Sequence, residues 1–469
     1  NSMLPEAVCQ RRRWLSGTLA VDGLFILAKI KRTMGYFPEL EKIWQEYLAW
    51  LALARERGLS ASSFAGKTSR FLATEKKKLQ ERLEKMRPSR KEPDSLKAIR
   101  QLRPSGPRRL TEKLSTQQLP DRLLGAWLGR AAGCILGLPC EGMSKEAIRF
   151  VCLNHAHPYP LSDYWSHDPK PLPPQTLHYG TTARRNFLKP HLSSIGADDD
   201  LAYTILGLLL LEEKGSCFTT KDVARAWLKY LPLACTAEAV ALNNLKHGIS
   251  PDRAGQVDNP YSDWIGADIR SDPWAYAAPG WPEKAAEMAY YDAFLSHRGT
   301  GIHAAMFFSA AISAAFVCQD PLEAIRIALT EIPRDCRLAR TVRQTIDWCH
   351  RDRDWEKTTD RILKTFSGMS AAHALNNAAV TVASLVYGGG DFSRTIALAV
   401  MAGLDTDCNG ATAGSLAGAM LGASRLPSRW KKPLGNQVHT YLKGHKNFHS
   451  DELAARFHRI ALKVLDESI

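Results

Sequence analysis

From residue 119 onward, the chain is a succession of apolar stretches whose hydrophobic residues recur at helical spacing. The alternation of apolar and polar residues that is typical of half-buried strands is almost absent. The pattern therefore predicts an all-α domain. The expected helices cover residues 121–138, 199–213, 220–230, 282–296, 302–317, 320–331, 336–349, 354–366, 371–386, 392–402 and 409–422.

One long segment between these helices, residues 154–191, has little periodic pattern and is rich in Pro, Tyr, Trp and His. Long ordered loops of this kind are often functional, so we expect it to lie over a site. Its histidines could ligate a metal, but their irregular spacing favours exposed or loop-packing roles. They are His155, His157, His167, His178 and His191.

Two of the predicted helices carry a glycine at every fourth position, which places the glycines along one helix face. Each helical glycine costs about 1 kcal/mol relative to alanine. Close backbone packing of the two helices would offset this cost and is enough to explain the glycines. The two sets are Gly125, Gly129, Gly133 and Gly137, and Gly410, Gly414, Gly418 and Gly422.

Acidic residues stand at the ends of these glycine-rich helices. Glu141 follows the first helix, while Asp405 and Asp407 lie in the turn before the second. If the glycine faces meet, these carboxylates arrive at the same end of the helix pair. A third acidic group, Asp198, Asp199 and Asp200, directly precedes the apolar run over residues 201–211.

Six carboxylates in one partly desolvated cleft would repel each other strongly. Raised carboxyl pKa values would relieve that repulsion only in part, whereas a bound cation would relieve it better. Mg²⁺ and Mn²⁺ suit carboxylate, hydroxyl and water ligands, and Thr406 could add its hydroxyl or main-chain carbonyl. The pattern predicts a divalent-metal site.

Three stretches of the sequence resemble, in order and at comparable separations, the signature stretches of the ADP-ribosylglycohydrolases. They are "DRLLGAWLGRAAGCILGLPCEG", "ADDDLAYT" and "GLDTDCNGATAGSLAGAMLG". The resemblance covers about residues 119–430. It implies an orthogonally packed all-α bundle with a binuclear Mg²⁺ or Mn²⁺ centre at the mouth of a cleft.

The resemblance also implies roles for the acids. Asp199 and Asp200 match paired aspartates of the family, and Asp405 and Asp407 match its later Asp-x-Asp; all four are expected to ligate metal, with Asp198 beside them. Glu141 matches a glutamate that in some members helps to activate water. We therefore assign catalysis to Glu141, Asp199 and Asp200.

Four further residues are expected to bind substrate. The segment "IGADIR" looks like a family segment near the substrate phosphates, which makes Gly266 and Arg270 phosphate candidates. His297 resembles a histidine at the start of the following helix, and Asn409 lies beside the late acids.

The sequence also departs from the family pattern. Asp198 stands where a ligand Thr is usual, Leu201 replaces a second Thr, Cys408 replaces a Thr or Ser, and Cys134 replaces a common Asp. A thiol at position 408 would weaken the binding of a hard metal ion. These changes indicate that the centre binds metal differently and that the substrate need not be a protein ADP-ribosyl group.

The positive charge of the chain is concentrated before residue 119. Residues 1–118 hold 25 Lys or Arg and 12 Asp or Glu, a net charge of +13, whereas the remainder holds 37 and 36. We therefore divide the chain into a basic helical extension with a linker, residues 1–118, and a catalytic domain, residues 119–469. A basic segment indicates an acidic partner or nucleic acid, although a solvated helix face with a flexible linker explains it equally well.

Within the extension, residues 38–58 have the apolar spacing and end signals of a helix. A second, charged helix is expected over residues 74–86, and the proline-rich basic stretch 87–110 is expected to be a linker or a partly ordered arm.

The compartment is predicted from weaker signals. The ten cysteines form neither a CxxC pair nor a Cys/His cluster, which favours free thiols in a reducing compartment. The longest apolar runs, residues 201–211 and 304–318, are shorter than the roughly 18 to 20 residues of a membrane span. With no secretory signal pattern, we expect a cytoplasmic protein that does not bind membranes.

The favoured function is metal-dependent hydrolysis of an N- or O-ribosidic bond, removing ADP-ribose from a modified protein, nucleic acid or small molecule. Two metal ions would bind the ribose diol and a water that attacks the anomeric carbon. The alternative is a partner-binding or immunity module of the same fold, which blocks a toxin or ADP-ribosyltransferase through its N-terminal extension.

Overall fold

The computed structural model describes residues 89–155, 157–170 and 176–466, together with a few residues between 71 and 81. The helix predicted over residues 38–58 and most of the one over 74–86 lie outside the described residues. The chain divides into two compact units, Asn1–Arg87 and Pro88–Ile469. Helices α5 to α22 and strands β1 to β4 all belong to the second unit.

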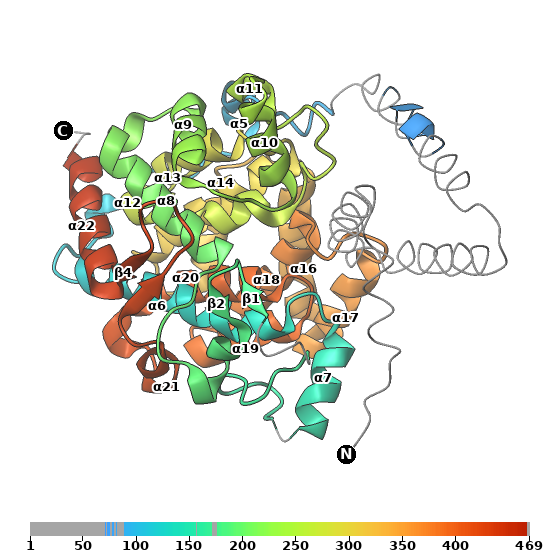
Figure 1. Ribbon diagram of the computed structural model, residues 1–469, viewed down its shortest axis with the longest axis vertical. Helices are drawn as coiled ribbons and strands as arrows, with labels where there is room; N and C mark the ends of the chain where they lie inside the picture. The colour runs from blue at the N-terminus through green and yellow to red at the C-terminus, as the bar shows by residue number, and fades with distance from the viewer. Residues whose placement is uncertain are drawn as a thin grey trace, which may run out of the picture. The chain divides into compact units, whose positions relative to one another are not determined.

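The second unit is a bundle of helices with two short antiparallel sheets (Figure 1). Each helix predicted after residue 119 is present, with ends that differ by a few residues, and the prediction of an all-α fold is confirmed. The strands are β1 Leu177–His178, β2 Thr182–Ala183, β3 Gln437–His439 and β4 Asn447–His449. The α-helices are α5 Leu96–Leu102, α6 Leu119–Gly137, α7 Lys145–Asn154, α8 Asp199–Lys214, α9 Thr220–Tyr230, α10 Thr236–Lys246, α11 Pro251–Ala254, α12 Asp272–Ala277, α13 Pro282–Ala293, α14 Thr300–Ala315, α15 Pro321–Ala328, α16 Arg337–Asp352, α17 Trp355–Thr365, α18 Ala374–Gly388, α19 Phe392–Met401, α20 Thr406–Leu421, α21 Ser428–Lys431 and α22 Ser450–Asp466.

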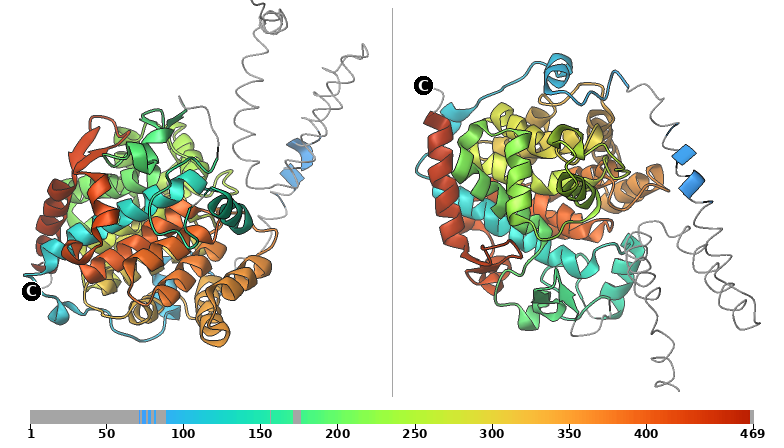
Figure 2. Two further views of the ribbon diagram at one scale, coloured as in Figure 1. Left: turned by 90° about the horizontal axis from the view of Figure 1, so that it is seen from below. Right: turned by 45° about the horizontal axis from the view of Figure 1, so that its top comes forward.

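Helices α6 and α20 pack against each other through their glycine faces in the middle of the bundle (Figures 1 and 2). A Cβ atom on Gly133 would lie 1.8 Å from the carbonyl oxygen of Gly410, and one on Gly129 would lie 2.2 Å from that of Gly414. The approach is therefore backbone to backbone, and the predicted contact of the two glycine faces is confirmed. It brings the C-terminal end of α6 to the N-terminal end of α20.

By length and composition, the stretch Leu119–Cys140, which contains α6, is apolar enough to cross a membrane, and it is the one such helix among the described residues. Arg122 and Arg130 lie within the stretch, so the sequence shows no uninterrupted apolar run of this length there. Its apolar window is 94% buried inside the protein. The apolar character of α6 therefore serves the core of the bundle.

The segment before α6 belongs to the same compact unit, so the prediction of a linker is wrong for residues 89–110. Ile99 of α5 is fully buried. Arg103 and Arg108 form ion pairs with Glu331 at 2.6 and 2.7 Å, and that carboxylate is itself fully buried. The compact unit thus begins near residue 88, before the predicted boundary at 118/119.

The first described residues of this unit bind to the start of α14. The amide of Gly299, the residue before α14, donates to Oδ1 of Asp94 at 2.6 Å. Nε2 of the buried His303 lies 3.0 Å from the carbonyl oxygen of Pro93, and its Nδ1 lies 3.4 Å from Oε2 of Glu92. Burial lowers the pKa of His303, but hydrogen bonding and charge from Cys336 and Glu92 outweigh it and raise the pKa to about 9.

The raised pKa of His303 predicts that the free energy of unfolding depends on pH. Because its folded-state pKa exceeds the usual 6.5 of a histidine, its stabilisation is fully present below about pH 6.5 and is lost as the pH rises through about 9. We expect the wild type to lose on the order of 3 kcal/mol relative to His303→Gln between pH 6 and pH 10. Chemical denaturation of both proteins across that range measures the difference, and parallel curves would contradict the assignment.

Candidate metal centre

Three acidic segments that are far apart in the sequence meet at one place in the fold. Their candidate metal-binding atoms form three sets, and within each set the atoms lie within 4.8 Å of one another. The sets overlap at Asp200 and Asp407, so they form one continuous centre. They are Asp198, Asp199 and Asp200; Asp200, Asp407 and Cys408; and Glu141, Asp405 and Asp407.

Asp198 is the N-cap of α8, and its side chain is held from three directions. Oδ1 accepts the amide hydrogen of Asp200 at 3.0 Å and the thiol of Cys134 at 3.3 Å. Oδ2 lies 2.8 Å from Nε2 of His178, on strand β1. A carboxylate suits this position, because its two oxygens offer enough acceptor sites for all three partners.

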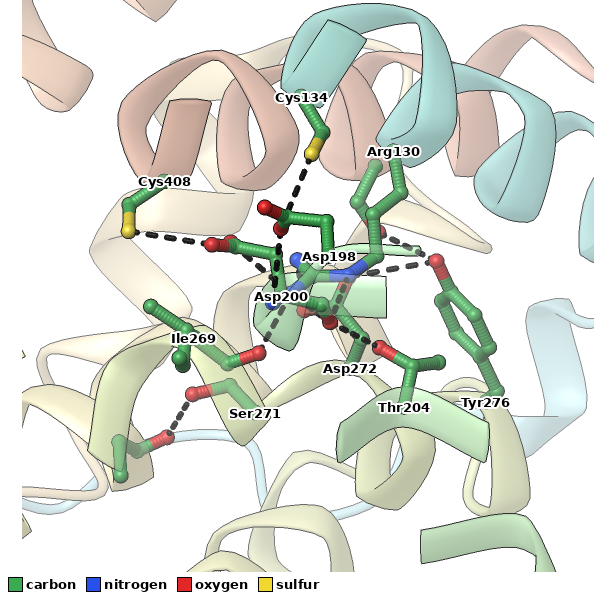
Figure 3. A network of polar contacts seen from close by, with 12 residues as sticks. Arg130, Cys134, Asp198, Asp200, Thr204, Ile269, Ser271, Asp272, Tyr276 and Cys408 are labelled. Atoms are coloured by element: carbon green, nitrogen blue, oxygen red, sulfur yellow. Dashed lines mark hydrogen bonds and ion pairs between the residues drawn. The ribbon is translucent and has the colours of Figure 1, made fainter. Parts of the chain in front are cut away.

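Asp200 is fully buried and faces a buried arginine of α6 (Figure 3). Arg130 donates to the carbonyl oxygen of Asp200 at 2.8 Å, lies 3.3 Å from its Oδ1, and pairs with Asp272 at 2.6 Å. This single cation fixes the first turn of α8 and balances part of the negative charge. Arg130 was not among the site residues predicted from the sequence.

The second pair of aspartates is positioned by the turn before α20. Leu404 has a positive φ of 66°, a strained conformation that is common at functional sites. The amide of the next residue, Asp405, donates to Oδ1 of Asn377 at 3.2 Å, and that oxygen also accepts from Asn409 at 2.8 Å. Asn409 therefore helps to position the turn, and its contact with substrate stays a prediction.

Glu141 joins these aspartates from the end of the 3₁₀ turn Leu138–Cys140 that continues α6. The neighbouring Gly142 donates its amide to the carbonyl oxygen of Leu404 at 2.9 Å, which ties the two loops together. Lys170, from the long loop, donates to the main-chain carbonyl of Glu141. Glu141 and Asp199 are partly exposed, whereas Asp198, Asp200, Asp405 and Asp407 are buried, so the centre opens on the side of Glu141 and Asp199.

The electrostatics of the cluster favour a bound cation. Burial, followed by the charge of Glu141, raises the pKa of Asp405 to about 6. Burial also raises the pKa values of Asp199, Asp200 and Asp407 well above the usual value, and neighbouring acids add to each shift. Oδ1 of Asp407 is buried and has no hydrogen-bond partner among the described residues. The donor set and this unpartnered oxygen fit a divalent ion, with the acids above and Cys408 as its candidate ligands.

The predicted phosphate candidates lie in the buried segment Ile265–Arg270, in which the carbonyl oxygen of Ile269 accepts from Arg130. Arg270 is 1% exposed and bonds to Glu238 and Asp292, each at 2.8 Å, and to Ser296 at 3.0 Å. A Cβ atom on Gly266 would lie 2.1 Å from the Glu238 carboxylate, so glycine is needed there for packing. The guanidinium of Arg270 is therefore engaged by acids that are distant in sequence, and the phosphate contacts of Arg270 and Gly266 stay predictions.

His297 is also fully buried. Its Nδ1 lies 2.8 Å from the Ser296 hydroxyl, while its Nε2 has no partner among the described residues. Burial, aided by the positive charges of Arg270 and Arg298, lowers the pKa of His297 well below its usual value. The imidazole is therefore neutral, and the structure does not place it in the acidic cluster.

The described part of the long loop lies over the centre, as predicted. His178 contacts Asp198, and Arg184 donates to the carbonyl oxygen of Pro139 at 2.6 Å. Tyr179 stacks on Tyr441 with ring centroids 4.9 Å apart. Of the five loop histidines, His178 alone is placed beside the acids by a described contact, a role that irregular spacing could not reveal.

Comparisons with known proteins agree with this architecture. The family model described as ADP-ribosylglycohydrolase matches residues 115–463. A solved structure titled "ADP-ribosylglycohydrolase-related protein complex" is similar in fold, with 21% sequence identity and a TM-score of 0.50; the match covers 74% of this chain and 99% of that one. A search of curated proteins finds no match.

Proposed function

Because the chain belongs to the ADP-ribosylglycohydrolase family, whose activity is glycosidic hydrolysis, we propose that it is a metal-dependent hydrolase that removes ADP-ribose from a modified protein, nucleic acid or small molecule. The observation that carries the proposal is the meeting of six acids, from three segments, around the unpartnered oxygen of Asp407. A structural role for such a cluster would be unfavourable, because buried like charges destabilise one another.

The position of each acid suggests a division of labour. When bound, Mg²⁺ or Mn²⁺ would supply positive charge to polarise the ribose hydroxyls and lower the pKa of a water. The buried Asp198, Asp200, Asp405 and Asp407 would hold the ions. Glu141 or Asp199, the partly exposed acids, would accept the proton of the attacking water as the bond between the anomeric carbon and the leaving group breaks.

Surrounding groups keep these acids in place. Arg130 orients Asp200 through two contacts, and Asn377 holds the amide of Asp405. Cys134 and His178 hold Asp198. Because each positioning group lies on another element, the acids stay at fixed separations when the substrate arrives.

The proposal predicts hydrolysis that depends on metal. We expect the protein to release ADP-ribose from at least one of three substrates: ADP-ribosylated arginine, ADP-ribosylated serine and ADP-ribosylated nucleic acid. The release should occur only when Mg²⁺ or Mn²⁺ is present. Asp199→Ala and Asp405→Ala should lose the activity, each by a factor of about 100 or more. Chromatography of the released ADP-ribose measures this. Metal-independent turnover, or full activity in both variants, would refute the proposal.

The basic residues before position 88 lie almost wholly outside the described residues. Their proposed partner, an acidic protein or nucleic acid, rests on charge alone. If they bind nucleic acid, the affinity should fall steeply with salt concentration, because phosphate contacts release counterions.

A further inference from the structure

Two buried thiols point at the acidic cluster from the paired glycine-rich helices (Figure 3). Sγ of Cys408, on α20, lies 3.2 Å from Oδ2 of Asp200. Sγ of Cys134, on α6, lies 3.3 Å from Oδ1 of Asp198.

The two thiols are not equivalent. Cys408 belongs to a set in which its sulfur and one oxygen each of Asp200 and Asp407 lie within 4.8 Å of one another. Cys134 belongs to none of the candidate sets among the described residues; it donates to an oxygen that already accepts the Asp200 amide. Both thiols donate a hydrogen bond to an aspartate, but Cys408 alone also belongs to a set of atoms that could hold an ion.

A second observation points to an ion at this set. Asp407 is only 4% exposed, and its Oδ1 has no hydrogen-bond partner among the described residues. A buried carboxylate oxygen without a partner is costly unless something positive binds it. Arg130, the cation that faces Asp200, makes no contact with Asp407 in the structure.

The chemistry of the donors decides which ion fits. A thiolate is a soft ligand that binds Zn²⁺ and similar transition-metal ions, whereas Mg²⁺ takes oxygen ligands. The neighbouring set of Glu141, Asp405 and Asp407 offers oxygen alone. The centre thus contains one candidate metal position with a sulfur donor and one with oxygen donors alone.

We propose that the centre is chemically asymmetric: the position formed by Asp200, Asp407 and Cys408 takes a borderline transition-metal cation, Zn²⁺ or Co²⁺, with the Cys408 thiolate as a ligand. The position at Glu141, Asp405 and Asp407 takes a hard ion, Mg²⁺ or Mn²⁺. As the sulfur–metal bond forms, the thiol proton leaves to the solvent. This inference rests on the proposed function, since it names the metal of the same centre.

The test uses Co²⁺ as a spectroscopic probe on the metal-stripped full-length protein. The wild type should develop a thiolate-to-cobalt charge-transfer band, which a purely structural role of the thiol cannot produce. Cys408→Ser should lose the band and bind Zn²⁺ at least about tenfold more weakly, with Mg²⁺ binding unchanged. Cys134→Ser is the matched control, because its hydroxyl keeps the hydrogen bond to Asp198, and it should keep the band.

The inference would be overturned if the wild type showed no charge-transfer band. It would also be overturned if Cys134→Ser lost the band while Cys408→Ser kept it. Circular dichroism checks that each variant is folded, and Cys408→Ala provides a second variant without a donor. The cobalt experiment and the hydrolysis experiment can fail independently of each other. A sulfur–cobalt band without ADP-ribose release would refute the hydrolase proposal alone, whereas hydrolysis with Mg²⁺ and no band would refute the asymmetric centre alone.

Discussion

Replacing Asp407 with asparagine should make the metal-free protein more stable while it removes hydrolysis. Burial, followed by the charges of Glu141 and Asp405, raises the pKa of Asp407 well above its usual value, so its ionised form is unfavourable in the empty cluster. An amide has the same shape without the charge, and its NH₂ can donate to the neighbouring carboxylates. We therefore expect metal-free Asp407→Asn to unfold at a higher denaturant concentration than the metal-free wild type at pH 8.

The same substitution removes a ligand shared by both candidate metal positions. ADP-ribose release should fall by a factor of about 100 or more, and the rise in melting temperature that divalent metal gives the wild type should disappear. Asp320→Asn, at the exposed N-cap of α15, is the matched control and should change neither activity nor the metal response. A variant that is destabilised without metal, or that keeps its metal response, would contradict the interpretation of the cluster.

The pH dependence of the metal-free protein checks the same electrostatics. A carboxyl whose pKa is raised by folding contributes stability below its unfolded pKa and loses it as the pH rises through the folded value. For Asp405, whose pKa is about 6, this window runs from about pH 4 to somewhat above pH 6. The wild type should lose more stability than Asp407→Asn as the pH rises, because the variant lacks the raised carboxyl group of Asp407; chemical denaturation of both proteins at several pH values measures this.

The parts of the fold that local pattern controls could be predicted from the sequence. Apolar spacing located the long helices, and glycine at every fourth position predicted the contact of α6 with α20. Helix α22 was missed, although Ser450–Asp466 has the acidic first turn and the apolar stripe of an amphipathic helix. The error over residues 89–110 has another cause, because the buried carboxylate that neutralises Arg103 and Arg108 is Glu331, more than 200 residues away.

The residues of the site also divide into those that local sequence predicts and those that depend on distant partners. The six acids were predictable because the unfavourable clustering of carboxylates at helix ends is visible in the sequence. Arg130 could not be identified, since an arginine within an apolar helix gives no sign that it will face Asp200 and Asp272. The partners of Arg270 could not be identified for the same reason, because Glu238 and Asp292 come from other helices. Partners supplied across the fold decide whether a cation binds substrate or the protein itself.

Replacing Gly133 with alanine should destabilise the protein by about 3 kcal/mol or more, at the upper end of the cost of overpacking a core. The new Cβ would lie 1.8 Å from the carbonyl oxygen of Gly410 and 2.9 Å from the amide nitrogen of Ala411. Both are backbone atoms, so no side-chain rotation relieves the clash and α6 must separate from α20. The gain in helix propensity, about 1 kcal/mol, is too small to compensate.

The measurement is chemical denaturation of Gly133→Ala beside Gly389→Ala. Gly389, the C-cap of α18, has a φ of 56° and a ψ of 30° and no atom within 4 Å of its would-be Cβ, so its replacement should cost only the left-handed strain of about 1–2 kcal/mol. Separation of the two helices would also move Glu141 away from Asp405 and Asp407, so hydrolysis and metal binding should fall with stability. If Gly133→Ala were as stable as the wild type, the backbone contact of α6 with α20 could not be what brings the acids together.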